Sequence, residues 1–480
     1  MNIDKNQLKK RVFEHFEALC KIPHGSGNMD KIAQHCVDFA NKNSLKVIRD
    51  KANNIIIFKE AAKGYESSPT VILQGHLDMV CQRENGCDID FGKEGLQIFT
   101  DGDYIKAKGT TLGADNGIAV SYILTILESD NIPHPAIEAV FTTDEEIGMV
   151  GAAQLDASLL CGKRLINLDS ERDDTLTVSC AGGTEFIIDI PVNRKAVSGT
   201  QIEVVLCGLK GGHSGIEINK GRQNANILAG RFLNYMQAVT DFELISIDGG
   251  EKSNAITPSC SMKLCTKRPE KFIAAANAYL NVIKAENAAR EPGFCFEINS
   301  QNKNKHLCLD KNIKEQLIFL LACAPNGVVE MSADIEGLVE TSLNLGILKT
   351  NDDIISLDFS VRSNKQSAME AVIQKLKMLS TCISCSTYSS GFYPPWEYKD
   401  NSSLQKLYTE CFTRQFGTAP KVEAIHAGLE CGVFCAKIPD LECIAIGPTI
   451  YDVHTVNERL KISSAEQIFQ LLLNILGKIK

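Results

Sequence analysis

Residues 70–76 read Thr-Val-Ile-Leu-Gln-Gly-His, a short apolar run that ends directly in polar residues. Such a run is typical of a β-strand buried on both faces. Comparable runs occur at Asn54–Phe58, Ala136–Thr142 and Arg164–Leu168. Apolar residues at helical spacing lie around them, in residues 5–20, 28–42 and 117–128. This alternation predicts an α/β fold whose mixed, mostly parallel sheet is flanked by helices.

The middle of the chain has a different pattern. From about Gly183 to Pro395, alternating strands such as Glu203–Leu206 mix with helices, which indicates an inserted α+β domain. Beyond Trp396 the α/β pattern returns. We therefore predict one domain from residues 1–183 and 396–480, with residues 184–395 inserted into it. Weak similarity between residues 253–256 and 342–345 leaves open whether the insertion consists of two related halves.

Composition narrows the class of protein. The 480 residues carry 50 Lys+Arg against 59 Asp+Glu, a net charge of −9, and 44% are hydrophobic. These values are typical of a globular protein, and the acidic balance argues against partners such as nucleic acid or anionic membranes. No apolar stretch approaches the roughly 18 residues of a membrane span. No secretory signal is visible in Met1–Arg11, so we expect a cytoplasmic protein.

Eighteen cysteines are scattered along the chain. Without a visible export signal, reduced thiols are expected rather than disulfides. Cys382 and Cys385 form a CxxC pattern, and Cys431 and Cys435 a CxxxC pattern. Neither has a second Cys/His pair at zinc-site spacing nearby, so we expect buried, inert thiols in both.

Polar residues that could do chemistry follow the predicted strands. They are His76 and Asp78, the Asp144-Glu145-Glu146 triplet, Asp169, and His454 eight residues after an apolar run, with Asp115 at the start of a predicted helix. Side chains at the carboxyl ends of parallel strands can converge. Imidazole and carboxylate together suit catalytic Zn²⁺, Mn²⁺ or Co²⁺, and a carboxylate can bridge two ions. Consecutive Glu145 and Glu146 point to different sides, so one can bind metal while the other faces water.

Each of these clusters also has an ordinary interpretation. A His-x-Asp sequence after a strand can be a simple hydrogen-bonded pair, and an acidic triplet in a loop can be a solvated turn. The metal interpretation is favoured because several clusters in one chain supply a complete ligand set.

Longer motifs resemble a known family. They are Gln74-Gly-His-Leu-Asp78, Leu112-Gly-Ala-Asp-Asn-Gly117, Thr143-Asp-Glu-Glu-Ile-Gly148 and Asn167-Leu-Asp-Ser170. Together they resemble the dinuclear-zinc peptidases that include carboxypeptidase G, acetylornithine deacetylase and carnosinases. The motifs Gly211-Gly-His-Ser-Gly215, His426-Ala-Gly-Leu-Glu-Cys-Gly432 and Gly447-Pro448 with His454 are similar to one subgroup, the bacterial aminoacyl-histidine dipeptidases.

The resemblance implies a catalytic domain with two Zn²⁺ per subunit, for which Co²⁺ or Mn²⁺ could substitute. It implies that His76 and Asp169 hold one ion, Glu146 and His454 hold the other, and Asp115 bridges them. Asp78 would orient His76 by accepting its remaining ring N–H. Glu145 would be the general base. A cis peptide bond between Asp115 and Asn116 is also implied.

The inserted domain would be a lid. The resemblance implies that His213 contributes to catalysis at the oxyanion site, and that Asn254, Arg362 and Gly428 bind substrate. A guanidinium such as that of Arg362 suits the free carboxylate of a dipeptide.

The function implied is hydrolysis of dipeptides, of Xaa-His or carnosine-like type with broad specificity, by a hydroxide bridging two zinc ions. Partners would be a small dipeptide and, as a possible assembly, a second copy in a homodimer, with no nucleic acid and no membrane. One alternative is an N-acyl-amino-acid deacylase or carboxypeptidase of the same family. Another is an inactive peptide-binding scaffold, which the intact motifs disfavour.

Overall fold

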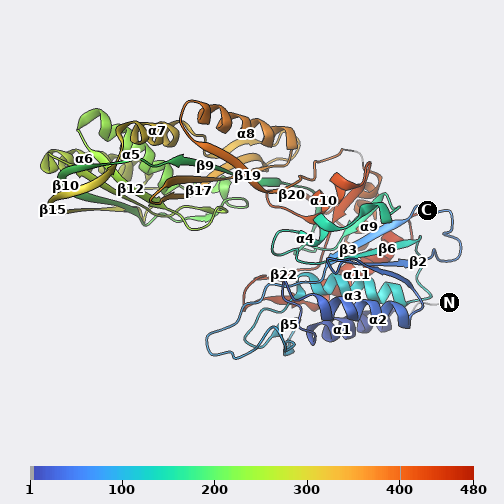
Figure 1. The fold of residues 1–480 in the computed structure, drawn as a ribbon. Helices are drawn as coiled ribbons and strands as arrows, with labels where there is room; N and C mark the ends of the chain where they lie inside the picture. The colour runs from blue at the N-terminus through green and yellow to red at the C-terminus, as the bar shows by residue number, and fades with distance from the viewer. Residues whose placement is uncertain (1–4, 401) are drawn as a thin grey trace. The chain divides into compact units, whose positions relative to one another are not determined.

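The computed structural model describes residues 5–400 and 402–480, which fold into two compact units (Figure 1). The first unit contains the described residues up to Cys180, Trp396–Ala424 and Leu429–Lys480. The second contains Ala181–Pro395 and the short segment Ile425–Gly428. The changes of unit after Cys180 and before Trp396 lie close to the predicted boundaries. Nothing in the sequence pattern indicated that residues 425–428 pack with the second unit.

The first unit is built on an eight-stranded sheet in the order β1-β2-β6-β3-β7-β21-β8-β20. Its central strands β6, β3, β7 and β21 are parallel, while β1, β2 and β8 pair antiparallel on either side. Every residue of β3 and β6 is buried, as expected for strands covered on both faces. The strand bounds are β1 Lys46–Arg49, β2 Ile55–Lys59, β3 Val71–His76, β6 Ile137–Thr142, β7 Arg164–Asn167, β8 Thr175–Cys180, β20 Lys421–Ile425 and β21 Glu442–Ala445.

Helices cover this sheet on its two sides. Figure 1 shows α1 and α3 on one side of the strands and α10 on the other. Ten of the eleven residues of α3 from Asn116 to Ile126 are buried, so this helix lies inside the unit. The helices are α1 Lys5–Cys20, α2 Asp30–Lys42, α3 Ala114–Glu128, α4 Val150–Gln154, α9 Ser403–Phe416, α10 Glu430–Lys437 and α11 Ile462–Leu476. A smaller sheet joins β4 Ile98–Asp101, β5 Tyr104–Ala107, β22 Ile450–Tyr451 and β23 Arg459–Lys461.

The second unit has an antiparallel sheet in the order β15-β10-β14-β12-β17-β18-β9-β19. Two sets of elements share the sequence β-α-β-β-α-β and the same strand arrangement, and they meet where β12 pairs with β17. One set is β10 Arg194–Cys207, α5 Ala225–Val239, β12 Glu243–Gly249, β14 Cys260–Thr266, α6 Pro269–Asn287 and β15 Cys295–Leu309. The other is β9 Gly182–Pro191, α7 Lys311–Cys323, β17 Val339–Thr350, β18 Ile354–Ser363, α8 Gln366–Thr381 and β19 Ser386–Tyr393.

Only one face of this second sheet is covered by helices (Figure 1). Residues along β10 alternate accordingly: Ile202, Val204 and Leu206 are buried, and the residues between them are partly exposed. Their side chains join the helices in one core that includes Phe232 of α5 and Phe272 of α6. The alternation read from the sequence therefore reflects a one-sided antiparallel sheet.

Candidate functional site

The polar residues predicted to converge in the first unit do so. His76 is the last residue of β3, Asp169 follows β7, and Glu146 lies in the loop after β6. Because these strands are parallel neighbours, their carboxyl ends present the three loops at one edge of the sheet. Asp115 at the start of α3 and His454, three residues after β22, complete a five-residue cluster.

The two carboxylate oxygens of Asp115 face different imidazoles. Oδ1 lies 3.1 Å from Nε2 of His76, which is in turn 3.5 Å from Oδ1 of Asp169. Oδ2 lies 3.2 Å from Nε2 of His454, which is 2.9 Å from Oε1 of Glu146. One carboxylate thus stands between two imidazole–carboxylate pairs. The peptide bond between Asp115 and Asn116 is cis, as the resemblance implied.

Burial shapes the electrostatics of the cluster. His76 is fully enclosed, with 1% of its side chain exposed, whereas His454 is 48% exposed. Burial, with the Asp115 charge adding to it, raises the pKa of Asp169 well above its usual range. Burial opposes the ionisation of Asp115 too, but hydrogen bonds with His454 and His76 hold its pKa below the usual range. Two imidazoles and three crowded carboxylates are groups that suit a divalent cation. Ligand atoms of His76, Asp115 and Glu146 all lie within 4.8 Å of one another.

Glu145 lies beside the cluster without belonging to it. Burial raises the pKa of Glu145 to about 8, and the charges of Glu430, Glu146 and Asp115 contribute to the increase. A carboxyl group whose pKa is raised in this way is well suited to accept a proton and release it again.

Asp78 contacts His76 differently from the expectation. Nδ1 of His76 lies 2.9 Å from the backbone carbonyl oxygen of Asp78 and 3.5 Å from its carboxylate, so the shorter contact is made by the carbonyl. The carboxylate accepts the backbone N–H groups of Glu145 at 3.0 Å and Glu146 at 3.2 Å, and the hydroxyl of Ser26 at 2.9 Å. Asp78 therefore positions the loop after β6 as well as the ring of His76.

Two residues with no assigned role in the sequence analysis hold the cluster in place. Glu458, only 3% exposed, accepts the backbone N–H groups of four consecutive residues, Leu112 to Asp115, at 2.7–3.3 Å. The Asn116 side chain donates to Asp169 Oδ1 at 3.0 Å and accepts the N–H of His76 at 3.2 Å. Asn116 belongs to the motif of residues 112–117, so the sequence offered a signal for it. No local pattern distinguishes Glu458 from an ordinary loop carboxylate.

A buried polar network supports the strands beneath the cluster. Glu430, at the start of α10, is fully buried and accepts hydrogen bonds from Gln74 at 2.5 Å and from the Thr142 hydroxyl at 2.7 Å. The side-chain oxygen of Gln74 accepts from Asn167 at 2.6 Å. These contacts link β3, β6 and β7, whose ends carry the cluster.

In the second unit, His213 has a defined tautomer. It lies in β11 Gly212–His213, where its Nδ1 accepts the backbone N–H groups of Gly215 at 3.1 Å and Ile216 at 3.2 Å. Burial, followed by the Arg362 charge, lowers the pKa of His213, which favours the neutral ring. With Nδ1 accepting, the ring proton resides on Nε2, and His213 is a hydrogen-bond donor there.

The other predicted substrate residues also belong to the second unit. The backbone oxygen of Asn254 accepts the N–H of Ser214 at 2.9 Å, next to His213. Arg362, on β18, is 9% exposed; its Nη1 donates to the Tyr393 hydroxyl at 3.0 Å, and its Nε has no hydrogen-bond partner among the described residues. Gly428 lies in the segment that packs with this unit.

His426 lies in the same segment and begins the motif of residues 426–432, but the resemblance implied no role for it. Its Nε2 lies 2.7 Å from the hydroxyl of Ser342. Burial, followed by the charges of Arg362 and His213, lowers the pKa of His426 to about 3, so the ring is neutral. His426 therefore lies near the same arginine as His213.

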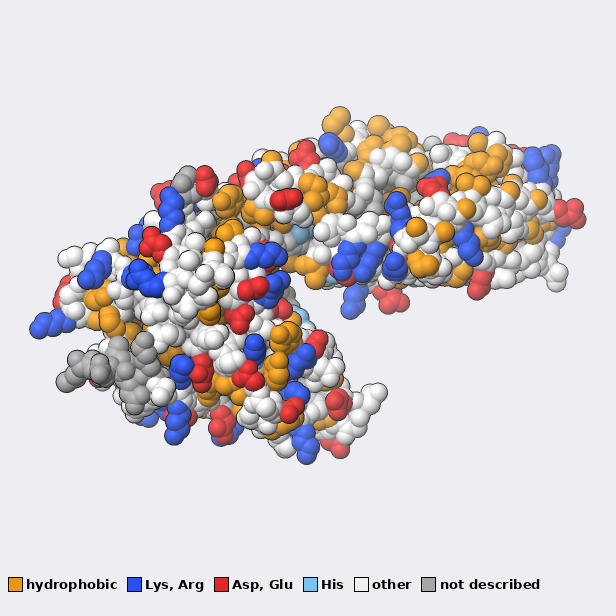
Figure 2. All heavy atoms as spheres, turned by 180° about the vertical axis from the view of Figure 1, so that it is seen from behind, with side chains coloured by type: hydrophobic (Ala, Val, Ile, Leu, Met, Phe, Trp, Pro, Cys, Tyr) orange, Lys and Arg blue, Asp and Glu red, His pale blue; other side chains and the backbone are white. Residues whose placement is uncertain are grey.

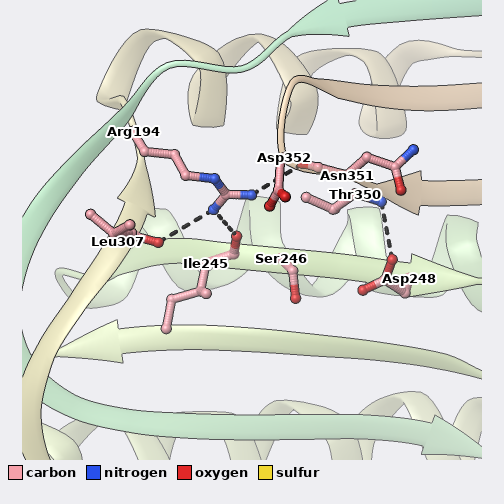
Figure 3. A pocket seen from close by; sticks show the side chains of 8 residues that line it. All are labelled: Arg194, Ile245, Ser246, Asp248, Leu307, Thr350, Asn351 and Asp352. Carbon is pink, nitrogen blue, oxygen red and sulfur yellow. Dashed lines mark hydrogen bonds between the residues drawn. The ribbon is translucent and has the colours of Figure 1, made fainter.

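Figure 3 shows a pocket of the second unit that is lined by none of the predicted site residues. Its arginine, Arg194, donates to the backbone oxygens of Ile245 at 2.9 Å, Leu307 at 3.3 Å and Asn351 at 3.2 Å. The guanidinium thus joins the ends of three segments of the sheet, which is a structural role.

The expectation of buried, inert cysteines is only partly correct. Cys431 is buried, but Cys435 and Cys385 are partly exposed and Cys382 is exposed. Cys382 and Cys385 follow α8, and Cys385 packs against the hydrophobic core of the second unit.

Comparison with known proteins identifies the family. The model of "Peptidase family M20/M25/M40" matches residues 72–478. The chain belongs to this peptidase family. It is 36% identical over 472 residues to the cytosol non-specific dipeptidase of Escherichia coli (strain K12), covering 98% of this chain and 97% of that protein.

Solved structures support the same family assignment. The aminoacylhistidine dipeptidase of Vibrio alginolyticus superimposes with a TM-score of 0.88 at 34% identity, covering 98% of this chain and 96% of that one. The aminopeptidase PepT of Bacillus cereus has a TM-score of 0.57 at 15% identity, with 98% of each chain covered, a likeness of fold. The predicted fold class and the family resemblance are confirmed.

The surface carries charged side chains of both signs, as the composition leads us to expect. On the face drawn in Figure 2, Lys and Arg side chains are interspersed with Asp and Glu. Among the described residues, no helix is both long and apolar enough to cross a membrane.

Proposed function

We propose that this chain is a metal-dependent dipeptidase that hydrolyses dipeptides of broad sequence, including Xaa-His. The observation that carries the proposal is Asp115, with one carboxylate oxygen toward His76 and the other toward His454. The similarity of nearly the whole chain to proteins named as dipeptidases supports dipeptides as the substrate class.

The five-residue cluster would hold two divalent cations, most simply Zn²⁺, with Co²⁺ or Mn²⁺ as substitutes. His76 and Asp169 would bind one, Glu146 and His454 the other, and Asp115 both. Such ions polarise a carbonyl and lower the pKa of water. Glu145 would accept a proton from the attacking water and deliver it to the leaving amine.

The second unit would recognise the substrate. His213, neutral and protonated on Nε2, would donate a hydrogen bond to the oxygen that gains negative charge in the transition state. Arg362, with an unpaired buried N–H, would bind the free carboxylate of the dipeptide. Asn254 and Gly428 would contact its polar groups.

A substrate panel tests the proposal. Purified, metal-loaded protein would be assayed with Xaa-His dipeptides, tripeptides, N-acetyl amino acids and C-terminally extended peptides. We expect dipeptides to have the highest kcat/KM. Preference for N-acetyl amino acids would support a deacylase, preference for longer peptides a carboxypeptidase, and absence of hydrolysis an inactive scaffold.

Replacing Arg362 should weaken recognition of the substrate carboxylate. For Arg362→Ala we expect KM for dipeptides to rise roughly 10- to 100-fold, because a charge-assisted hydrogen bond contributes about 1.5–3 kcal/mol. Activity on the corresponding dipeptide amides should change little. Arg268→Ala is the matched control, since exposed Arg268 precedes α6 where Arg362 precedes α8. An equal loss on acids and amides would contradict this role.

Glu458 should control metal affinity without binding metal. In Glu458→Gln, an amide NH₂ replaces an oxygen that accepts backbone N–H groups beside Asp115, which misplaces that carboxylate. We expect metal affinity to fall about 10- to 100-fold, measured by chelator competition on folded protein. The control is Glu466→Gln, because the Glu466 carboxylate is 35% exposed and pairs with Lys9. Unchanged affinity would argue against the role.

We also infer a cytoplasmic location, supported by the similarity of this chain to the cytosol non-specific dipeptidase of Escherichia coli. Assembly as a homodimer stays a prediction, which light scattering can test.

A further inference from the structure

Two cysteines face each other across neighbouring strands of the second unit. Cys207 is the last residue of β10 and Cys295 the first of β15, and they are directly paired in the antiparallel register. Their sulfur atoms lie 2.9 Å apart. Directly opposed residues in antiparallel strands have Cα atoms about 4.5–5.5 Å apart, which is within the range that a disulfide spans.

Solvent reaches this pair. Cys295 is exposed and Cys207 is partly exposed, so an oxidant can approach without opening the fold. A second close pair in the same sheet, Cys265 and Cys308, hydrogen-bond to each other but are at most 1% exposed. The two pairs differ in their access to solvent, and exposure is one of the properties that make a thiol susceptible to oxidation.

The position of the pair links it to a functional loop. Directly after Cys207, Gly208 approaches Gly293 so closely that a Cβ at Gly208 would lie 2.0 Å from the Gly293 carbonyl oxygen. The carboxylate of Glu291 then accepts the N–H of Lys210 at 2.9 Å. This stretch leads into β11 and His213, so a covalent link at Cys207 would anchor the start of that loop.

We propose that Cys207 and Cys295 form a reversible disulfide when the protein meets a peroxide. The thiolate of Cys295 attacks one oxygen of hydrogen peroxide and breaks the O–O bond, which gives a sulfenic acid and a hydroxide ion. The proton that the Cys295 thiol lost on ionisation converts this hydroxide into water. The Cys207 sulfur then attacks the sulfenic sulfur and displaces a second water. Overall, two thiols lose two hydrogen atoms and one hydrogen peroxide becomes two waters.

The link has a measurable consequence for stability. It closes the chain between residues 207 and 295, a long loop that includes α5 and α6. Cross-linking a long loop reduces the entropy of the unfolded chain, so the oxidised protein should unfold several degrees higher than the reduced protein.

To test this, the protein as purified with its metal is treated with excess hydrogen peroxide, and the remaining thiols are then alkylated. Its peptides are mapped without reduction. We expect a linked peptide pair containing Cys207 and Cys295, cleaved by dithiothreitol, while Cys265 and Cys308 stay unlinked. The higher unfolding temperature should be absent from Cys207→Ser. Alkylation of both Cys207 and Cys295 after treatment, or their conversion to sulfinic acids without a link, would overturn the proposal. The assignment is independent of the proposed peptidase activity.

Discussion

Glu145→Gln should abolish most of the turnover while leaving the metal in place. The substitution is nearly isosteric and removes none of the five proposed ligands, but an amide cannot take a proton from water. We expect kcat to fall by roughly 10²- to 10⁴-fold, the range that a general acid–base contributes. Steady-state kinetics and elemental analysis of the same preparation provide the measurement.

The neighbouring acid supplies a matched control. Asp144 is adjacent to Glu145, and its carboxylate accepts the backbone N–H of Gly27. Its backbone is in the left-handed region, with φ of 53°, which asparagine also adopts. Asp144→Asn should therefore keep most of the activity. If Glu145→Gln did so too, Glu145 would not be the proton carrier.

Asp115→Ala should cause the greatest loss of bound metal of any single ligand substitution. In the proposed site Asp115 serves both ions, whereas Asp169 and His454 each serve one. We expect the Asp115 variant to retain little metal, and Asp169→Ala and His454→Ala to retain about one ion each. Metal content per folded chain, measured by mass spectrometry after dialysis at matched free metal, distinguishes these outcomes.

The comparison also decides how many ions are bound. Equal losses in all three variants would argue for a mononuclear site, whereas loss in the Asp115 variant alone would argue for one ion held by His76, Asp115 and Glu146. Circular dichroism serves as the folding control, because Asp115 begins a buried helix.

Sequence alone was sufficient to predict which side chains converge in the first unit. The continuous apolar runs identify strands buried on both faces, and side-chain identity is local information, so His76, Glu146 and Asp169 could be placed at strand ends. Parallel strand ends converge by geometry, which is why residues nearly 100 positions apart could be predicted to meet. The family motifs added a proposed role for each residue.

Tertiary structure decided how those residues are held. Glu458 binds the N–H groups of residues more than 340 positions away, and Asp78 contacts His76 mainly through a carbonyl oxygen rather than its carboxylate. The Glu458 contacts depend on how two distant loops approach each other, and the Asp78 contact depends on the backbone conformation directly after β3. Neither composition nor periodicity encodes these two properties.

The same distinction applies to the second unit. Alternating burial in β10 was readable as a strand, but the pairing of Cys207 with Cys295 depends on the register between two strands separated by two helices. The tautomer of His213 likewise follows from two backbone N–H groups that only the folded loop presents. The sequence determined which groups are available and which segments become strands and helices, because those properties are local. The fold decided which atoms meet, because hydrogen-bond direction and strand register arise only when distant segments pack together.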